Sequence, residues 1–504
     1  MLESEQTASA FVEVPHQGPH PNFLQGVVSL GMSTTCLEPV ASSFPIGTPP
    51  EPLAVLAARA ACALEASMQR LVLAGDQDLG HLEVQAARDV QELLRQAIQR
   101  GAQAKADATP PVCPVCGQPL SRVSSDHPRT FQSRYGGITV GRPRGYCKRC
   151  RKWRTPADAA LGLEETAGYS PAVQDMAALL ASKMPVEEAS VVLEHLTGVK
   201  LPRATLAREA NRQGQRAQRL RAQLDQQAAT QKPQLELTLE PYQMILQLDA
   251  WNIRERDAWG KSAALRRAGQ EPERWHWVYT GTCFRLDHRG QTAGGRPVIT
   301  ERGFVATRQG IAGLREQLHA EALRRGLGQA ASALVIADGA VWIWRLADDR
   351  WPQARQRLDF YHAVQHLAAV GRALFGEDKE KLKAWLKPLV KQLKNESAIK
   401  VIRQLEEALA ALPSGPTAVA VAREVAYFHE HQGRMDYRTA QRAGEPIGSG
   451  PVEATCRQAQ CRFKRPGQFW SPAGDEALLC LEMFWRNGRW HLLFPHTAFD
   501  RARN

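Results

Sequence analysis

Three acidic residues stand in settings where a carboxylate could bind a metal ion. Asp249 and Asp338 each end a run of apolar residues, and Glu453 opens a helical stretch after a Gly-Ser-Gly turn. Hard carboxylate oxygens suit Mg²⁺ or Mn²⁺. Two such ions, roughly 3.5–4 Å apart, can activate a water or a 3′-hydroxyl and stabilise the leaving oxygen. The three acids therefore predict metal-dependent phosphodiester chemistry.

Other acids lie close to these three in the sequence. Asp257 stands in a polar stretch, and Asp348 and Asp349 lie between short apolar segments, as in a solvated turn. Glu445 precedes the Gly-Ser-Gly turn, and we expect it to face solvent. A lone acid at a strand end is more often a turn former than a ligand. The assignment therefore depends on whether the three acids occur in the right order within one fold.

The elements around the acids follow the order of an RNase H-like fold. The patterns predict strands over Tyr242–Asp249, Trp275–Leu286 and Pro297–Thr307, a helix over Gly310–Leu327, a strand over Ala333–Asp338, a short helix over Trp342–Leu346 and a strand over Arg355–Phe360. In that fold the first acid ends the first strand and the second ends the fourth. We expect a multidomain α+β protein whose mixed-sheet catalytic core, residues 236–362 and 446–495, is interrupted by an all-helical insertion over residues 363–445.

Four of the ten cysteines form two closely spaced pairs. Cys113 and Cys116 are followed, after thirty residues, by Cys147 and Cys150. Paired CxxC motifs at this separation fit a zinc ribbon, although chance pairing of thiols is the alternative. Four thiolates leave Zn²⁺ no open position, so the predicted site is structural. The intervening segment Thr130–Val140 predicts a hairpin with Gly-Gly at its turn.

A helical segment follows the ribbon, over residues 161–235. Pro185–Leu196 is amphipathic, Thr197–Val199 forms a turn, and a second helix starts at Leu201. The second helix carries four residues that could face DNA: Arg203, Thr205, Arg208 and Arg212. A helix-turn-helix places such a helix in the major groove, but many helical hairpins have the same pattern. DNA binding and structural packing both remain open.

The chain is basic, and its charge is concentrated. The formal net charge is +12, and the apolar fraction of 43% is that of an ordinary soluble protein. Between Val112 and Thr155, Asp126 is the one acid among these basic residues: Arg122, Arg129, Arg134, Arg142, Arg144, Lys148, Arg149, Arg151, Lys152 and Arg154. This density favours a nucleic-acid partner over a merely solvated face.

A lysine face in the helical insertion has two interpretations. Four lysines recur at helical spacing and share one side: Lys383, Lys387, Lys391 and Lys394. Most such faces are only solvated. This one interrupts a nuclease-like core, so contact with DNA is the second interpretation.

The ends of the chain carry little chemistry. Residues 1–50 are rich in Pro, Gly, Ser and Thr and predict a mobile leader, residues 51–106 predict a helical N-terminal segment, and 496–504 form a tail. The acidic start lacks the apolar core of a signal peptide, and no apolar run is long enough to cross a membrane. We therefore expect a cytoplasmic, nucleoid-associated protein with no membrane partner.

A further carboxylate and imidazole stand three residues apart. Asp359 and His362 lie at a strand-to-helix junction, where the two side chains can approach one another. On the pattern alone, a capping role for Asp359 with a satisfied histidine is favoured. His366 follows on the same face, but no glutamate of a zinc-protease motif accompanies it.

These motifs resemble the DDE transposases of bacterial insertion sequences, most closely the ISKra type, which is related to Mutator-like transposases. The resemblance rests on the strings Ile336–Trp344, Asp359–His362 and Pro446–Glu453, and spans about residues 110–490, including the ribbon. It implies an RNase H-like core, an all-helical insertion before the glutamate, and a Cys-or-Asp-x-x-His element after the second Asp. Gly467–Ser471 matches the expected ending of the family only in part.

The resemblance implies a transposase. Asp249, Asp338 and Glu453 would bind Mg²⁺, and His362 would stand beside them in the active site. The partners would be double-stranded DNA, both terminal inverted repeats and target, with a homodimer or higher oligomer in the synaptic complex. The alternatives are an RNase H-fold nuclease without strand transfer and a domesticated, non-catalytic DNA-binding protein.

Overall fold

The computed structural model describes residues 53–496, apart from residues 74, 76–77, 126, 164–167, 231–239, 257–259 and 472. The expected leader, most of the expected tail, and Asp257 lie outside the described residues. The chain divides into two compact units, Met1–Val90 and Gln91–Asn504, and each is described by itself.

The first unit contains two helices. They are α1 (Leu53–Leu73) and the first part of α2 (Leu79–Asp107). Asp89 of α2 accepts hydrogen bonds from Ser67 Oγ, at 2.7 Å, and from the guanidinium of Arg70, at 2.8 Å. Arg70 lowers the pKa of Asp89, and these bonds fix the register between the two helices.

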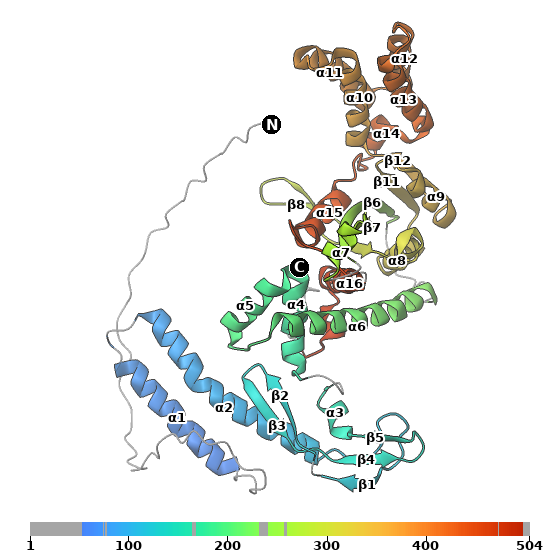
Figure 1. The fold of residues 1–504 in the computed structure, drawn as a ribbon. Coiled ribbons are helices and arrows are strands. Elements are labelled where there is room, and N and C mark those ends of the chain that lie inside the picture. Colours follow the sequence, from blue (N-terminus) through green and yellow to red (C-terminus); the bar gives the residue numbers. More distant parts are fainter. Residues whose placement is uncertain are drawn as a thin grey trace. The chain divides into compact units, whose positions relative to one another are not determined.

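The second unit begins with a small β-rich segment around the paired cysteines (Figure 1). Its three-stranded antiparallel sheet has the order β1-β4-β5 and is made of β1 (Ser121–Ser124), β4 (Arg144–Cys147) and β5 (Lys152–Arg154). The short α3 (Pro156–Ala160) follows.

The expected hairpin is present, but its turn differs from the prediction. β2 (Arg129–Ser133) pairs with β3 (Gly136–Val140), and Ser133 lies opposite Gly136. The turn therefore consists of Arg134 and Tyr135, and the two glycines begin β3. Ser133 explains the difference, because its Oγ donates to Gly136 O at 2.7 Å and accepts from Tyr135 N at 3.2 Å.

The second part of α2 covers the edge of this hairpin. Gln103 accepts from Gly141 N at 2.8 Å and donates to Gly141 O at 3.1 Å. One and two helical turns earlier, Gln99 accepts from Thr139 N, and Arg95 donates to the backbone of β3. These side chains thus bind backbone groups that an edge strand would otherwise leave without hydrogen-bond partners. The helix therefore continues into the second unit.

Three helices follow: α4 (Pro171–Lys183), α5 (Val186–Thr197) and α6 (Arg203–Thr230). Ser170 caps α4 by accepting from Val173 N, and Gly198 ends α5 with φ 70°, a conformation that favours glycine. The second predicted helix is present as α6, but α6 is much longer than a recognition helix.

The length of α6 is explained by what it packs against. One apolar cluster joins residues of α4, α5 and α6 to the sheet and to α16 (Gly474–Arg486). Trp490 Nε1 donates to Asp175 Oδ1 at 2.6 Å, and Lys183 pairs with Glu482. These helices therefore share a core with the sheet.

A five-stranded mixed sheet forms the centre of the second unit (Figure 1). In spatial order its strands are β10 (Gly303–Thr307), β7 (Glu273–Arg285), β6 (Gln243–Arg256), β11 (Ser332–Ala337) and β12 (Arg355–Leu358). β10, β7 and β6 are antiparallel neighbours, whereas β11 runs parallel to both β6 and β12. The protein is thus a mixed α+β protein.

Two strands differ from their predicted bounds. The first strand continues past Asp249 to Arg256, because β7 pairs with it over its whole length. The third divides: β9 (Pro297–Ile299) pairs with β8 (Arg289–Gln291) as a separate hairpin, and only β10 joins the main sheet. The connecting helices are α7 (Ser262–Arg267), α8 (Gly310–Arg324) and α9 (Val341–Arg350).

Residues after β12 form a group of helices that returns to its starting point (Figure 1). They are α10 (Phe360–Phe375), α11 (Lys379–Asn395), α12 (Ala398–Ala410), α13 (Pro416–Glu430) and α14 (Tyr437–Arg442). Phe360 N donates to Ile447 O at 2.9 Å, so the chain enters and leaves this group at one place. The apolar core is continuous from the sheet into these helices. The chain ends in α15 (Gly450–Phe463), α16 and α17 (Trp490–Leu493).

We predict that Gly214→Ala lowers the free energy of unfolding by about 1–3 kcal/mol, as overpacking does. A Cβ at Gly214 in α6 would lie 2.5 Å from the carbonyl oxygen of Ala477 in α16, and backbone cannot move aside cheaply. Thermal or urea unfolding measures the effect. Gly101→Ala in α2 is the control, because its Cβ would have nothing within 4 Å. Equal stability of the two variants would contradict the tight α6–α16 packing.

Candidate metal and nucleic-acid site

Asp249 and Asp338 lie on adjacent parallel strands. β6 pairs with β11 in a register that ends with Gln247 opposite Ile336. Continuing this register by two residues places Asp249 beside Asp338. Neighbouring strands are about 4.8 Å apart, so the two carboxylates can approach one another. The sequence placed both acids at strand ends; in the structure Asp249 instead lies within β6, just beyond the part that β11 covers.

The backbone at Asp338 is held tightly. Asp338 Oδ1 accepts from Ala340 N at 3.0 Å, and Tyr427 Oη donates to Asp338 O at 3.1 Å. Gly339 has φ 99°, and a Cβ there would lie 2.5 Å from Tyr427 Oη. Only glycine fits such a turn without strain. Tyr427 belongs to α13, so the helical insertion contributes directly to the position of Asp338.

Glu453 lies in the first turn of α15, where a buried hydrogen-bond chain reaches it. Ser449 Oγ lies 3.0 Å from Glu453 Oε1 and 2.7 Å from Asp359 Oδ2. Ser449 N also donates to Asp359. The Asp359 side chain is fully buried and accepts from His362 N at 2.9 Å as the N-cap of α10. One carboxylate thus joins the start of α10 to the start of α15.

Gln247 makes a second connection between the strand and α15. It is fully buried in β6, two residues before Asp249. Its Nε2 donates to Gly448 O at 3.2 Å, and its Oε1 accepts from Val452 N at 3.3 Å. Gln247 therefore fixes the turn that carries Glu453 against the strand that carries Asp249. The sequence reasoning missed it, although a single amide inside an apolar run was a visible signal.

The three acids are close enough to influence one another. Burial raises the pKa of Asp249, and the nearby carboxylates of Asp338 and Glu453 raise it further. Among the described residues, no lysine or arginine forms an ion pair with any of the three. Cys456, buried one helical turn after Glu453, also contacts Asp249 through its thiol.

His362 lies beside these acids. Its Nδ1 lies 3.5 Å from Asp359 Oδ1, an ion-pair distance without hydrogen-bond geometry. Asp359 raises the pKa of His362 against the effect of burial, and Asp338 and Glu453 raise it further. The imidazole is therefore biased toward its protonated form beside the three carboxylates. The sequence left open whether Asp359 caps a helix or pairs with His362. In the structure Asp359 caps α10 and also lies within ion-pair distance of His362.

Ligand spacing distinguishes the acids from one another. Asp359, His362 and Glu453 have potential ligand atoms within 4.8 Å of one another. Asp359 is fully buried, and its oxygens already accept bonds from Ser449 and from the backbone of α10. It is therefore a poor metal ligand. Asp249 and Asp338 do not fall into a group this tight within the described residues, and unpaired carboxylates repel one another.

Of the other acids considered as alternatives, Glu445 has a structural role. Glu445 was expected to face solvent, and that expectation is wrong: its side chain is 7% exposed and pairs with Arg357 at 2.6 Å and with Arg355. The sequence could not show this, because the two arginines lie on β12, about 90 residues earlier. Asp348 and Asp349 are exposed, as expected, but they lie in α9 rather than in a turn.

The four paired cysteines come together as a possible metal site. Their sulfur atoms lie within 4.8 Å of one another: Cys113, Cys116, Cys147 and Cys150. Cys113 Sγ lies 3.9 Å from Cys150 Sγ, and Cys116 Sγ lies 3.5 Å from Cys147 Sγ. A tetrahedron with Zn–S bonds of 2.3 Å has edges of about 3.8 Å. Four thiolates at this spacing could hold a structural Zn²⁺.

The arginines expected to face DNA differ in their surroundings. Arg203 is 72% exposed and lies 3.9 Å from Glu187, whereas Arg212 pairs at 2.6 Å with the buried Glu209. The inner face of α6 packs on the core. The N-terminal end of the helix, with Arg203 and Arg208, is exposed, and so are later positions on its outer side, such as Arg219.

The lysine face of α11 is open to solvent. Lys383, Lys387 and Lys391 are exposed, while Leu389 and Leu393 on the other side are buried. The structure leaves both interpretations of this face open.

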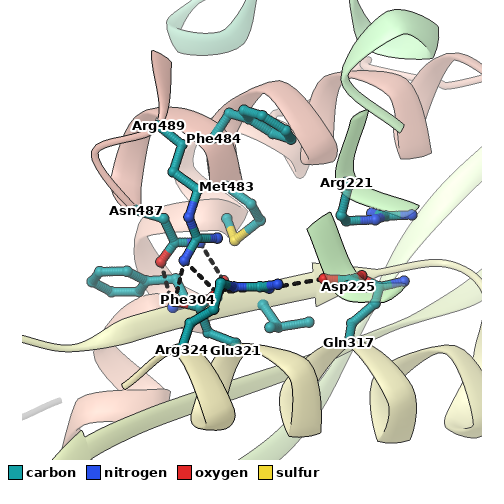
Figure 2. A pocket seen from close by; sticks show the side chains of 11 residues that line it. Arg221, Asp225, Phe304, Gln317, Glu321, Arg324, Met483, Phe484, Asn487 and Arg489 are labelled. Carbon is teal, nitrogen blue, oxygen red and sulfur yellow. Dashed lines mark hydrogen bonds and ion pairs between the residues drawn. The ribbon is translucent and has the colours of Figure 1, made fainter. Parts of the chain in front are cut away.

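A small cavity of about 30 Å³ between α6, α8 and the end of α16 is a separate feature (Figure 2). Arg489 binds the buried Glu321 through both carboxylate oxygens, at 2.8 and 2.6 Å. Burial raises the pKa of Glu321, but Arg489, Arg324 and Arg325 outweigh it and hold the pKa below its usual value. Figure 2 shows Arg489 beside Glu321 and Arg324 beside Asp225, and these ion pairs tie α6, α8 and the end of α16 together.

The chain matches no model of a known protein family and no curated protein. None of the helices in the described part of the chain is long and apolar enough to cross a membrane. We therefore infer function from the residues of this chain.

We predict that the purified protein carries one Zn²⁺ per chain and that Cys147→Ser loses it. Structural Zn²⁺ supplies folding free energy, so the variant should also make residues 112–155 more sensitive to proteolysis. Metal analysis of protein purified without a chelator measures the content. The exposed Cys461 provides the control, since Cys461→Ser should keep the metal. Protein without Zn²⁺ would contradict the ribbon.

We predict that Glu445→Gln lowers the free energy of unfolding by about 3 kcal/mol at neutral pH, because it leaves the buried Arg357 without its partner. Arg355 and Arg357 hold the folded pKa of Glu445 below its usual value, against the effect of burial. The stabilisation is therefore present above the unfolded pKa and is lost as the pH falls through the folded one. Urea unfolding at several pH values tests this.

The wild type and Glu445→Gln should converge in stability in acid. Glu407→Gln, at an exposed position of α12, is the matched control and should change little at any pH. A difference between wild type and Glu445→Gln that stayed constant with pH would refute the ion-pair explanation.

Proposed function

We propose that this protein is a metal-dependent DNA transposase. It would cleave DNA at the ends of a mobile element and join the freed 3′-hydroxyls to target DNA. The observation that carries the proposal is that the register of β6 and β11 and the bonds of Gln247 and Ser449 bring the positions of Asp249, Asp338 and Glu453 together, while no described lysine or arginine forms an ion pair with them. Elsewhere in the described residues, buried acids such as Glu321, Glu445 and Glu482 pair with arginine or lysine. Unpaired acids held together favour a bound cation.

The order of the elements supports an RNase H-like core. Strands β6, β7, β10, β11 and β12 appear in the spatial order 3-2-1-4-5, with the first three antiparallel and the last two parallel to the first. The two aspartates belong to the first and fourth strands, and the glutamate to a helix that follows the helical insertion. The order of these elements is the one that the resemblance to DDE transposases implies, although Asp249 lies within β6 rather than at its end.

The donor set fits Mg²⁺ or Mn²⁺. Carboxylate oxygens are the hard ligands that these ions prefer, and Asp249, Asp338 and Glu453 would hold them. Bound ions would lower the pKa of a water or 3′-hydroxyl and neutralise charge on the phosphate. The bond from Ala340 N to Asp338 and the bond from Ser449 Oγ to Glu453 would keep these carboxylates in place when the cations are absent.

His362 would act as a positioning residue. Held by Asp359 and biased toward the protonated form, its imidazolium faces the acids and can attract the scissile phosphate. Charge placed in advance of the reaction costs no reorganisation when the transition state forms.

DNA recognition would come from other parts of the chain. The zinc ribbon carries the dense positive charge noted above, and the open end of α6 presents Arg203 and Arg208. The ribbon and helical segment would bind the terminal inverted repeats of the element. The protein would then be cytoplasmic and associated with the nucleoid. Holding two ends together would require at least a dimer.

We predict that Asp249→Asn, Asp338→Asn and Glu453→Gln each abolish cleavage and joining while leaving DNA binding nearly unchanged. Each change keeps the shape of the side chain and removes the charge that holds the cation. The losses should be non-additive, because the three residues act as one unit. Cleavage of a plasmid bearing the element ends, and joining of a labelled 3′ end to a second plasmid, are the measurements.

Asp348→Asn is the matched control, because this exposed aspartate lies ten residues after Asp338 and outside the site. Glu445→Gln cannot serve, because Glu445 is structural. Cleavage without joining by the wild type would assign the protein to nucleases of this fold. A Glu453→Gln protein that still transposes at a near-normal rate would refute the assignment of the third acid.

A further inference from the structure

One face at the far end of β6 and β7 is both aromatic and exposed. Trp275, Trp277 and Tyr279 alternate along β7, so their side chains lie on one face of the sheet. Tyr279 is covered by Trp342, with ring centroids 5.3 Å apart. Trp275 and Trp277 are 56% and 53% exposed. Two large aromatic side chains open to solvent side by side call for an explanation.

Cations gather on the same face. Arg254 lies opposite Trp275 in the register, with its guanidinium 5.5 Å from the indole centre. Lys464 Nζ lies 5.4 Å from the same ring and donates to Asn252 Oδ1, which is opposite Trp277. Both cations thus stand within 6 Å of one exposed indole.

A segment after α15 completes the face. Trp470 bonds to β6 through Arg254 O and Arg256 N, so residues 469–470 extend the sheet at this edge. Phe469 then lies under two guanidinium groups, those of Arg254 at 4.9 Å and Arg256 at 3.9 Å. We call Trp275, Trp277, Arg254, Lys464 and Phe469 the aromatic–cationic face.

The charge of this region is strongly positive. Glu273 is the acid that pairs here, and it is shared among Arg254, Arg256 and Arg266. With Lys464 added, four cations face one carboxylate among these described residues. Lys464 forms no ion pair among the described residues, so an anion could bind beside it.

The elements that carry this face also carry two of the three acids. Asp249 and Arg254 are five residues apart in β6, roughly 16 Å along the strand. Glu453 lies in the first turn of α15, and Lys464 follows the last turn. Because side chains alternate along a strand, Asp249 and Arg254 lie on opposite faces of the sheet, so a nucleic-acid strand from the acids would reach the aromatic–cationic face by crossing the edge of β6 beyond β11.

We propose that the aromatic–cationic face binds unpaired nucleotides of the DNA substrate next to the position of cleavage. The indoles would stack on bases, and Arg254 and Lys464 would contact the adjoining phosphates. The inference rests on the proposed function, because it takes DNA as the substrate, and it specifies that the DNA is locally unpaired.

Unpaired DNA explains the combination better than other partners do. The bases of a duplex are stacked on one another, so their flat faces are not accessible to an indole. Single strands expose those faces, and each base stacked on an aromatic side chain strengthens binding irrespective of sequence. Cations alone would be enough for duplex phosphates, and the exposed tryptophans would then have no role.

The test uses the full-length protein with three labelled DNA probes of equal length: a duplex, the same duplex with five unpaired bases at one end, and a single strand. Binding is measured by fluorescence anisotropy without added Mg²⁺, so that cleavage does not interfere. The variants are Trp275→Ala with Trp277→Ala, the matched pair Trp275→Phe with Trp277→Phe, and Lys464→Gln. Thermal unfolding checks that each variant is folded.

Wild type should bind the partly unpaired probe more tightly than the duplex. The double alanine variant should lose that preference, with a fall in affinity for unpaired probes of roughly 5- to 100-fold and little change for duplex. The double phenylalanine variant should keep most of the preference. Lys464→Gln should weaken binding of unpaired probes and reduce the salt dependence by about one phosphate contact.

Several results would overturn the inference. They are a wild type without preference for unpaired DNA, a double alanine variant that keeps the preference, and equal losses on duplex and unpaired probes. Binding of the face to anionic lipid vesicles, with unchanged DNA affinity in the alanine variant, would make it a lipid surface instead. Because these readouts do not require cleavage, they are separate from the test of the three acids, which can fail or succeed independently.

Discussion

The candidate site depends on one constraint: three carboxylates from distant parts of the chain must be held together against their mutual repulsion. The restraint is a small set of buried hydrogen bonds. Gln247 binds the backbone on both sides of the turn before Glu453, and Ser449 links Asp359 to Glu453. Each Gln247 bond is a neutral hydrogen bond worth about 0.5–1.5 kcal/mol, and the one hydroxyl proton of Ser449 adds a bond to a carboxylate worth about 1.5–3 kcal/mol. Together they can offset the repulsion, so the geometry exists before any cation binds.

The same bonds explain why an insertion of some eighty residues is compatible with a fixed site. The chain leaves the sheet at Asp359 and returns at Ile447, and one backbone bond joins the two points. The inserted helices also act back on the site, because Tyr427 donates to the carbonyl oxygen of Asp338. Its ring stacks on His366, with centroids 3.6 Å apart, and that imidazole binds Glu424 at 2.6 Å. The insertion thus helps to hold the backbone at Asp338 in place.

Local patterns predicted much of this architecture, and long-range contacts account for what they missed. Apolar runs predicted β6, β7 and β11, and paired cysteines predicted their own cluster, because these signals lie within a few residues of one another. The burial of Glu445 depends on arginines that precede it by about 90 residues, and no local pattern carries that information. The length of α6 depends likewise on α16, more than 240 residues later. Gln247 was accessible in principle, since an amide in an apolar run must find buried partners.

Ion pairing distinguishes acids that stabilise the fold from acids that are free to bind a cation. Glu321 binds three arginines, and its pKa is held down despite complete burial, so it is ionised and fully used by the fold. Asp249 is also largely buried, yet its neighbours are further acids, and its pKa is raised. A cluster of carboxylates without a cation does not stabilise the folded protein, because its members are either protonated or repel one another. A cation that binds all three acids would turn that unfavourable electrostatic energy into affinity, and this is the strongest physical reason to regard the three acids as a functional site.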